Sequence, residues 1–188
     1  MEVRAVRVRA GPAYARPMRE IRLRPLRASD LDALATNESP EADEWNYFEA
    51  RAANTLHHRF AMNGCISEES GQLAIESPDG ELLGSMSWHE VRHGPSRACV
   101  ALSMGISLLP QHRNQGYGSA AQRAFTRYLF DTRLVERIEA GTDVENIAEQ
   151  KALERAGFTR EGVLRHAQFR AGRWHDVVLY SRLRSDPG

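Results

Sequence analysis

Residues 108–119 read LLPQHRNQGYGS and join a strand-like run over residues 99–108 to a helix-like run over residues 120–130. Two glycines, Gly116 and Gly118, stand where that helix would begin. Glycine lets a backbone approach a ligand closely, and the free N–H groups of a first helical turn attract anions. The stretch therefore predicts a phosphate-binding turn. The alternative is a glycine-rich loop that only turns the chain.

The spacing of the glycines distinguishes between kinds of phosphate loop. A Walker loop ends in Gly-Lys-Ser/Thr, and a Rossmann fingerprint has three glycines with an acidic residue after the next strand. Here the element is Arg113-x-x-Gly116-x-Gly118, preceded by Pro110, and it contains no lysine. It resembles the acyl-CoA pyrophosphate loop of the GNAT N-acetyltransferase superfamily.

A second segment carries the same resemblance. Residues 146–158 read NIAEQKALERAGF and are similar to the segment that follows the fifth strand in this superfamily. Residues 161–165 (EGVLR), 172–181 (GRWHDVVLYS) and 21–34 most resemble the RimJ/RimL branch, which comprises ribosomal-protein N-terminal acetyltransferases and relatives that modify small molecules. Two motifs in the right order, separated by a strand-like run, are more specific than either motif alone.

The composition is that of an ordinary globular protein. The 188 residues suit a single domain, which we place at 20–188 after a poorly ordered extension over 1–19, with Met18 as a candidate natural start. Basic and acidic residues number 25 each, which argues against a nucleic-acid or membrane-surface protein. No apolar run approaches the ~20 residues of a membrane span and no leader-like start is present, so we expect a cytoplasmic location. Cys65 and Cys99 lack metal-ligand spacing, so we expect free thiols and no metal.

The patterning predicts a mixed α/β (α+β) fold. Ser29 is expected to cap the first helix, Pro78-Asp79-Gly80 to close a hairpin, and Gly157 to end the last helix. The expected strands are 20–26, 72–76, 81–90, 99–108, 135–142, 158–170 and 174–183. The first expected helix begins at residue 29, and the other three cover 43–62, 120–130 and 146–156. The resemblance implies the GNAT fold, a mixed, mostly antiparallel twisted sheet of about seven strands flanked by four helices.

The resemblance also implies acetyl-CoA as cosubstrate. The backbone of Met104, Gly105 and Ile106 would pair with the pantetheine arm, and a bulge at Gly105 would splay the strand from its neighbour. Asn146 would bind the pantetheine, cap a helix, or do both. The remaining cofactor-binding residues would be Gln111, Arg113, Asn114, Gln115, Gly116, Tyr117, Gly118, Ser119 and Arg155.

Members of this superfamily transfer the acyl group directly to an amine in a ternary complex. An aliphatic amine has a pKa near ~10, so a base must remove its proton. Glu139 is the expected base, and the alternative is a structural ion pair with Arg137. Glu161, Glu90 and His89 are weaker candidates.

The acid that protonates the departing thiolate is open. Many superfamily members have a tyrosine four residues before the Gly-Phe pair, where this chain has Leu153. RimL-like relatives often have a serine three residues after the asparagine, where this chain has Glu149. Solvent or Glu149 would have to serve, so the expected catalytic residues are Glu139, Asn146 and Glu149.

Candidate acceptor-binding residues are Trp45, Trp88 and His89, although aromatic side chains more often pack in a core. Acidic residues near Trp45 would attract a cationic amine, or would complement a helix start. The acceptor would be a protein N-terminus, an amino sugar, a polyamine or an amino-acid derivative. The alternatives are a CoA-binding regulatory module and a transferase for another acyl-CoA, such as succinyl-CoA. A homodimer is common in this branch.

Overall fold

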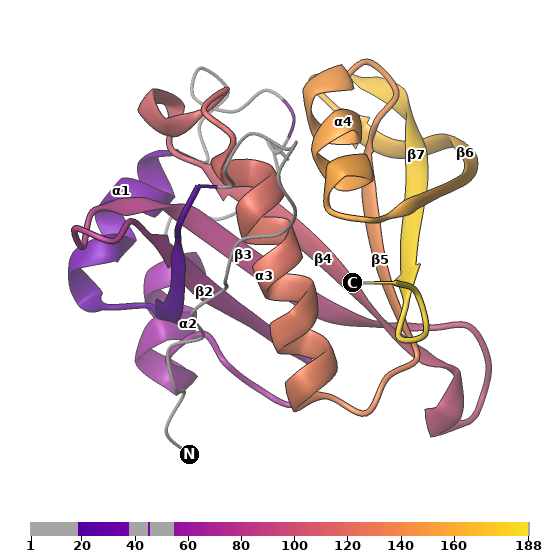
Figure 1. Cartoon of the computed structure of the whole chain (residues 1–188), viewed down its shortest axis with the longest axis horizontal. Helices are drawn as coiled ribbons and strands as arrows, with labels where there is room; N and C mark the ends of the chain where they lie inside the picture. The colour runs from indigo at the N-terminus through magenta and orange to yellow at the C-terminus, as the bar shows by residue number, and fades with distance from the viewer. Residues whose placement is uncertain (1–18, 38–44, 46–54, 188) are drawn as a thin grey trace.

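The computed structural model describes residues 19–37, 45 and 55–187 (Figure 1). Its seven-stranded sheet has the order β1-β2-β3-β4-β5-β7-β6, and β4–β5 is its parallel pair. The strands are β1 Arg22–Pro25, β2 Ser70–Glu76, β3 Leu82–Arg92, β4 Val100–Leu108, β5 Arg137–Asp143, β6 Thr159–Arg170 and β7 Arg173–Leu183. The helices are α1 Leu31–Thr36, α2 Thr55–Asn63, α3 Tyr117–Thr132 and α4 Ile147–Arg155.

This architecture confirms the expected fold class and order of elements. The predicted extension over 1–19 lies outside the described residues except for Arg19, and so does the candidate start at Met18. Much of the helix predicted at 43–62 also lies outside them. Of its described residues, Trp45 is in a turn and 55–62 belong to α2.

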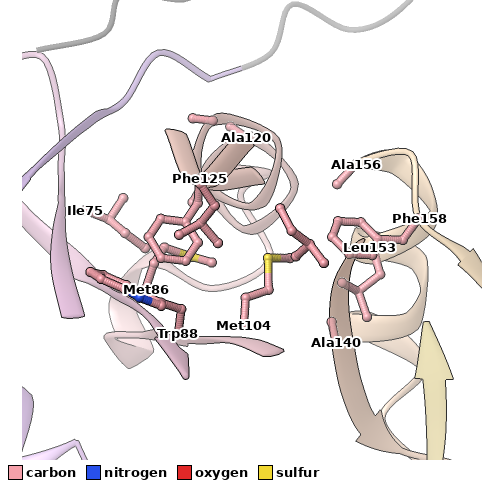
Figure 2. Close-up of a cluster of buried hydrophobic side chains, with 14 of the residues drawn as sticks. Ile75, Met86, Trp88, Met104, Ala120, Phe125, Ala140, Leu153, Ala156 and Phe158 are labelled. Carbon is pink, nitrogen blue, oxygen red and sulfur yellow. The ribbon is translucent and has the colours of Figure 1, made fainter. Parts of the chain in front are cut away.

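Apolar residues are buried on both faces of the sheet, as alternation along β2 shows. Leu73 and Ile75 belong to the larger core under α3, whereas Ala74 between them packs with residues of α1 and α2. Figure 2 shows the larger core, where Met104 of β4 lies between the cluster around Phe125 and the cluster that includes Leu153 of α4. This core fixes both α3 and α4 against the same face of the sheet.

Helix α3 begins directly after Gly116. That residue has a φ of 89°, in the left-handed region that glycine adopts without strain. Ala121, Phe125 and Leu129 follow at intervals of four, are 0% exposed and face the sheet. The sequence therefore determines both the start of the helix and the side that is buried, which aims its N-terminus at the end of β4.

The pairing of β4 with β5 is short. It covers Leu102↔Ile138 to Met104↔Ala140 and ends there, and the two strands then diverge toward α4 (Figure 1). On its other edge β4 pairs with β3 continuously, without a register shift. The bulge expected at Gly105 is therefore wrong. The opening results from β5 turning away from β4, because β5 continues alongside β7 as far as Asp143↔Val177.

Two of the three expected helix-end features are present. Asn146 caps α4 by accepting the N–H of Glu149, and Gly157 has a φ of 90° after the end of α4. The predicted cap at Ser29 is wrong, because that residue lies within a 3₁₀ turn. Asp30 instead accepts the Arg27 N–H at 2.7 Å and pairs with Arg24 at 2.6 Å. A charged pair with the neighbouring strand replaces the expected local hydroxyl cap.

Candidate functional site

A cavity of about 680 Å³ opens where β4 and β5 diverge, between the N-terminal ends of α3 and α4. Its volume is within the range of small-molecule sites. Twelve of the predicted site residues line it: Trp45, Met104, Gly105, Ile106, Arg113, Asn114, Gly116, Gly118, Ser119, Asn146, Glu149 and Arg155. Gln111, Gln115, Tyr117, Glu139, Trp88 and His89 do not line it.

One end of the cavity is suited to an anion. The first turns of α3 and α4 both line it, so two positive helix ends meet there. Arg113, Lys151 and Arg155 also line the cavity and add three positive side chains to it. Phosphate groups are the ligands that such an arrangement favours.

Arg113 also stabilises the loop itself. Its Nε donates to the Leu108 carbonyl oxygen at 2.9 Å, and its Nη2 donates to Asn37 Oδ1 at 3.2 Å. The Asn37 amide donates to Ser107 Oγ at 2.7 Å. Asn37, which is 3% exposed, therefore connects the end of α1 to the turn after β4. Sequence reasoning missed this residue, because its partners are about seventy positions away.

Glu149 and Gln122 meet at the junction of α3 and α4. The Gln122 Nε2 donates to the Glu149 carboxylate, and both residues line the cavity. The Glu149 N–H donates to Asn146 Oδ1 at 3.2 Å, which fixes the first turn of α4. Gln122 was not predicted. The available signal was a polar pair, Gln122 and Thr126, on the apolar side of α3.

A buried charged cluster lies at the end of β5, where Asp143 lines the cavity. Its carboxylate pairs with Arg170, accepts from His175 Nδ1 at 2.7 Å, and accepts the Glu145 N–H at 2.8 Å. Burial disfavours the ionised carboxylate, but these three partners outweigh it and hold the pKa of Asp143 below its ordinary value. The cluster joins β5 to the β6–β7 hairpin beside the site.

Glu139 lies on β5 next to Ala140, which lines the cavity. It is 5% exposed, and its carboxylate accepts from Arg137 Nε at 2.8 Å and from His93 Nε2. The ion pair with Arg137 is therefore present. The role of Glu139 as base stays a prediction.

Arg137 also binds Glu161 of β6 through two hydrogen bonds, at 2.7 and 2.5 Å. Hydrogen bonding from Arg137 and Ser181 outweighs partial burial and lowers the pKa of Glu161 to about 2. A lowered carboxylate pKa adds stability that is present above the unfolded value of 4.5 and is lost as the pH falls toward 2.

Replacing Arg137 tests this assignment. In Arg137→Met we expect the pKa of the Glu161 carboxyl to rise from about 2 toward 4.5, because its main hydrogen-bond donor is gone. Carbon-detected NMR titration of the glutamate carboxyls measures the shift. Arg160→Met, in the same strand as Glu161, is the control and should leave the titration midpoint of the Glu161 carboxyl unchanged. An unchanged midpoint in Arg137→Met would contradict the assignment.

The predicted acceptor residues lie in different places. Trp88 is 2% exposed and packs against Phe125 with ring centroids 5.9 Å apart, so the structure places it in the core. His89 is exposed on β3, opposite Ser103 of β4. Trp45 lines the cavity, and the acidic residues that precede it lie outside the described residues.

The predicted loop residues outside the cavity support the turn. The Gln115 amide donates to the Gln111 carbonyl oxygen at 2.6 Å, and the Gln115 carbonyl oxygen accepts from Arg19 at 3.2 Å. The Arg19 guanidinium also lies over the Tyr117 ring, 5.4 Å from its centroid. These residues contact one another around the phosphate-loop candidate.

Among the residues at 19–37, 45 and 55–187, no group of three or more His, Cys, Asp or Glu side chains is arranged to hold a metal ion. Within those same ranges, no helix combines the length and the apolar character needed to cross a membrane.

The diverging parallel strands, the glycine turn and the two helix ends together form a cavity suited to an anionic ligand. A family model for the acetyltransferase (GNAT) domain matches residues 20–159. The chain therefore belongs to the GNAT acetyltransferase family and is an acyltransferase.

Individual proteins agree with this assignment. A probable N-acetyltransferase of Bacillus subtilis, YjcK, is 26% identical over 175 residues, which are 88% of this chain and 95% of that protein. The spermidine N-acetyltransferase of Vibrio cholerae, solved with CoA and spermine, superposes with a TM-score of 0.76 at 21% identity, covering 88% of this chain and 96% of that one.

RimJ of Mycobacterium smegmatis, solved with a CoA disulfide, gives a TM-score of 0.71 at 23% identity, covering 96% of this chain and 87% of that one. Its fold agrees with the RimJ/RimL-like resemblance of the sequence motifs.

Proposed function

We propose that this protein is an acetyl-CoA-dependent N-acetyltransferase that transfers the acetyl group directly to a primary amine in a ternary complex. The observation that carries the proposal is the cavity in which two helix N-termini and the diverging β4 and β5 meet. The name of the Bacillus subtilis relative and the CoA complexes of the two structural neighbours support it.

The chain offers a group for each part of CoA. Arg113, Lys151, Arg155 and the helix ends would bind the phosphates. The edge of β4 beyond Met104 would bind the amides of the pantetheine arm as an added strand does. The apolar side chain of Ile106 and the Ala140 methyl group would line the path of the arm.

The reaction joins the amine nitrogen to the thioester carbonyl carbon and breaks the carbon–sulfur bond, with the electron pair leaving on sulfur. Backbone N–H groups near Met104 to Ile106 would stabilise the intermediate oxyanion. A base removes one proton from the amine, and an acid gives one to the sulfur. Glu139 is our candidate base and Glu149 our candidate acid.

The base assignment has a direct test. In Glu139→Gln we expect kcat to fall at least about 10-fold with little change in the KM for acetyl-CoA, because removing a general base affects proton transfer rather than donor binding. Glu136→Gln, an exposed change in the preceding segment, is the control. A lower melting temperature with unchanged kcat would instead assign Glu139 to the ion pair with Arg137 and His93 alone.

The acceptor is a proposal at the level of a primary amine. Trp45 at the cavity and the exposed His89 are candidates to contact it. A cytoplasmic location and a homodimer stay predictions. A CoA-binding regulatory module and a succinyl-CoA transferase are the competing functions.

Calorimetric titration with acetyl-CoA, succinyl-CoA and free CoA tests the donor. We expect micromolar binding that favours acetyl-CoA. An acetylation screen with spermidine, an amino sugar, an amino acid and short peptides with free N-termini then tests the acceptor. Binding without turnover of any amine would favour the regulatory module, and no binding to any donor would overturn the proposal.

A further inference from the structure

Gln122, in the second turn of α3, is 0% exposed and lines the cavity. Its Nε2 donates to Glu149, but its Oε1 is buried and accepts no hydrogen bond from any residue in the described ranges. Burying an amide oxygen without a donor costs free energy, and few native side chains are left this way. The position therefore points to a use for that oxygen.

The partner of Gln122 is held from the other side. Glu149 is the third residue of α4, and its N–H is fixed by the Asn146 cap at 3.2 Å. From this position its half-buried carboxylate meets the amide of Gln122 across the α3–α4 junction. Both side chains line the same cavity, so the pair adjoins the space assigned to the acyl donor.

An amide has a donor and an acceptor on one planar group. An ionised carboxylate only accepts hydrogen bonds, whereas a protonated carboxyl also donates one. With Glu149 ionised, Gln122 donates through Nε2, as the structure shows. With Glu149 protonated, a half-turn of the Gln122 amide brings Oε1 round to accept the new O–H. The oxygen that lacks a donor in one state gains it in the other.

We propose that Gln122 is a positioning residue that holds Glu149 in both of its protonation states, so that Glu149 can act as the acid. This inference rests on the proposed function. As the carbon–sulfur bond breaks and its electron pair moves to sulfur, the Glu149 proton passes to sulfur and forms the thiol. Glu149 becomes a carboxylate that accepts the Gln122 N–H, and it regains a proton from solvent before the next turnover.

The cavity that Glu149 lines also has other charged groups around it, and these would influence Glu149. Cations favour its ionised form and an anion opposes it. They lie on α3, on the loop before it, on β5 and on α4 itself, and they are Arg123, Arg113, Asp143, Lys151 and Arg155. These groups are the same in wild type and in Gln122 variants, so a comparison between the two isolates the contribution of the amide.

NMR of protein labelled with ¹⁵N-glutamine tests the pairing without any activity. Absence of the Gln122 side-chain NH₂ signals in Gln122→Leu assigns them. We expect these signals to move through the same pH midpoint as the Glu149 carboxyl carbon, and to lose this pH dependence in Glu149→Gln. Signals that stay in place while Glu149 titrates would overturn the proposal.

A double-mutant cycle tests the consequence for catalysis, using an amine that the wild type acetylates. Glu149→Gln and Gln122→Leu should each lower kcat at least about 10-fold with the KM for acetyl-CoA within about 2-fold, and the double variant should be no slower than Glu149→Gln. If the two effects instead multiply, Gln122 does not act through Glu149.

Thr126→Val is the matched control, since Thr126 is also buried on α3 and its hydroxyl donates to the backbone carbonyl oxygen of Gln122. It should leave kcat within about 2-fold of wild type. Melting temperatures are measured for every variant. If Gln122→Leu does not fold, Gln122→Asn replaces it, because the shorter side chain keeps a polar amide but withdraws it from Glu149. A wild type that acetylates no amine would remove the proposed function, and the NMR experiment would still decide the pairing.

Discussion

Gly118→Trp should weaken binding of acetyl-CoA at least about 100-fold, a loss of about 2.7 kcal/mol. Gly118 lies in the first turn of α3 and lines the cavity. An added Cβ would be in ordinary contact, 3.8 Å from Leu108 Cδ1 and 4.0 Å from Ala152 Cβ. An indole at this position would therefore extend between α3 and α4 and occupy the space of the phosphates. Calorimetric titration with acetyl-CoA measures the effect.

Gly118→Ala is the matched control. Its methyl group has room, and the backbone there is not in the left-handed region, so binding should remain within about 3-fold of wild type. Gly116 is a poorer site for this test, because its φ of 89° would strain any other residue and mix a folding effect with steric blocking. Wild-type affinity in a folded Gly118→Trp protein would show that CoA does not bind in this cavity.

Asp143→Asn should lower the free energy of unfolding at neutral pH by about 3 kcal/mol, because it removes one charge from a buried pair. Asp143 and Arg170 are both 3% exposed, so water cannot replace the lost carboxylate. The Arg170 guanidinium and the His175 ring would then face a neutral amide. Urea unfolding at several pH values measures the change.

The pH dependence has a defined sign. The pKa of Asp143 is lowered in the folded protein, so its ionised form stabilises the fold above the unfolded value of 3.8, and this contribution is lost as the pH falls through the lower folded value. The difference in the free energy of unfolding between wild type and Asp143→Asn should therefore become smaller below pH 3.8.

Glu145→Gln is the control for that experiment. Its carboxylate pairs with Arg173 at 3.5 Å, but the two side chains are 61% and 65% exposed, so its loss should cost no more than about 0.5 kcal/mol. Equal losses in Asp143→Asn and Glu145→Gln would contradict the account of a buried cluster.

The sequence was sufficient for features that depend on local chemistry. The glycine turn before α3, the Asn146 cap and the positive φ at Gly157 follow from residue types and their spacing. Apart from the helix predicted at 43–62, most of which lies outside the described residues, alternation and periodicity gave the strands and helices to within a few residues. The predicted cap at Ser29 failed because a tertiary ion pair, Asp30 with Arg24, decided that turn.

Contacts between distant segments could not be predicted in the same way. Glu149 was a candidate, but its partner Gln122 is 27 positions away on another helix. Asp143 and Arg170 are equally far apart, and only the folded hairpin brings them together. The divergence of β4 from β5 also depends on both strands together. The sequence of either strand alone therefore gave no sign that the strands separate without a bulge at Gly105.

The short β4–β5 junction has a mechanical consequence. Three register pairs join β1–β4 to β5–β7, whereas nine join β3 to β4. The β4–β5 junction is therefore the shortest strand pairing in the sheet, and the cavity lies beyond it, between the part formed by β1–β4 and the part formed by β5–β7. A ligand in the cavity would contact both parts of the sheet. Such a ligand would hold the two parts together. Backbone amide exchange near the β4–β5 junction should therefore slow in both parts when the ligand binds.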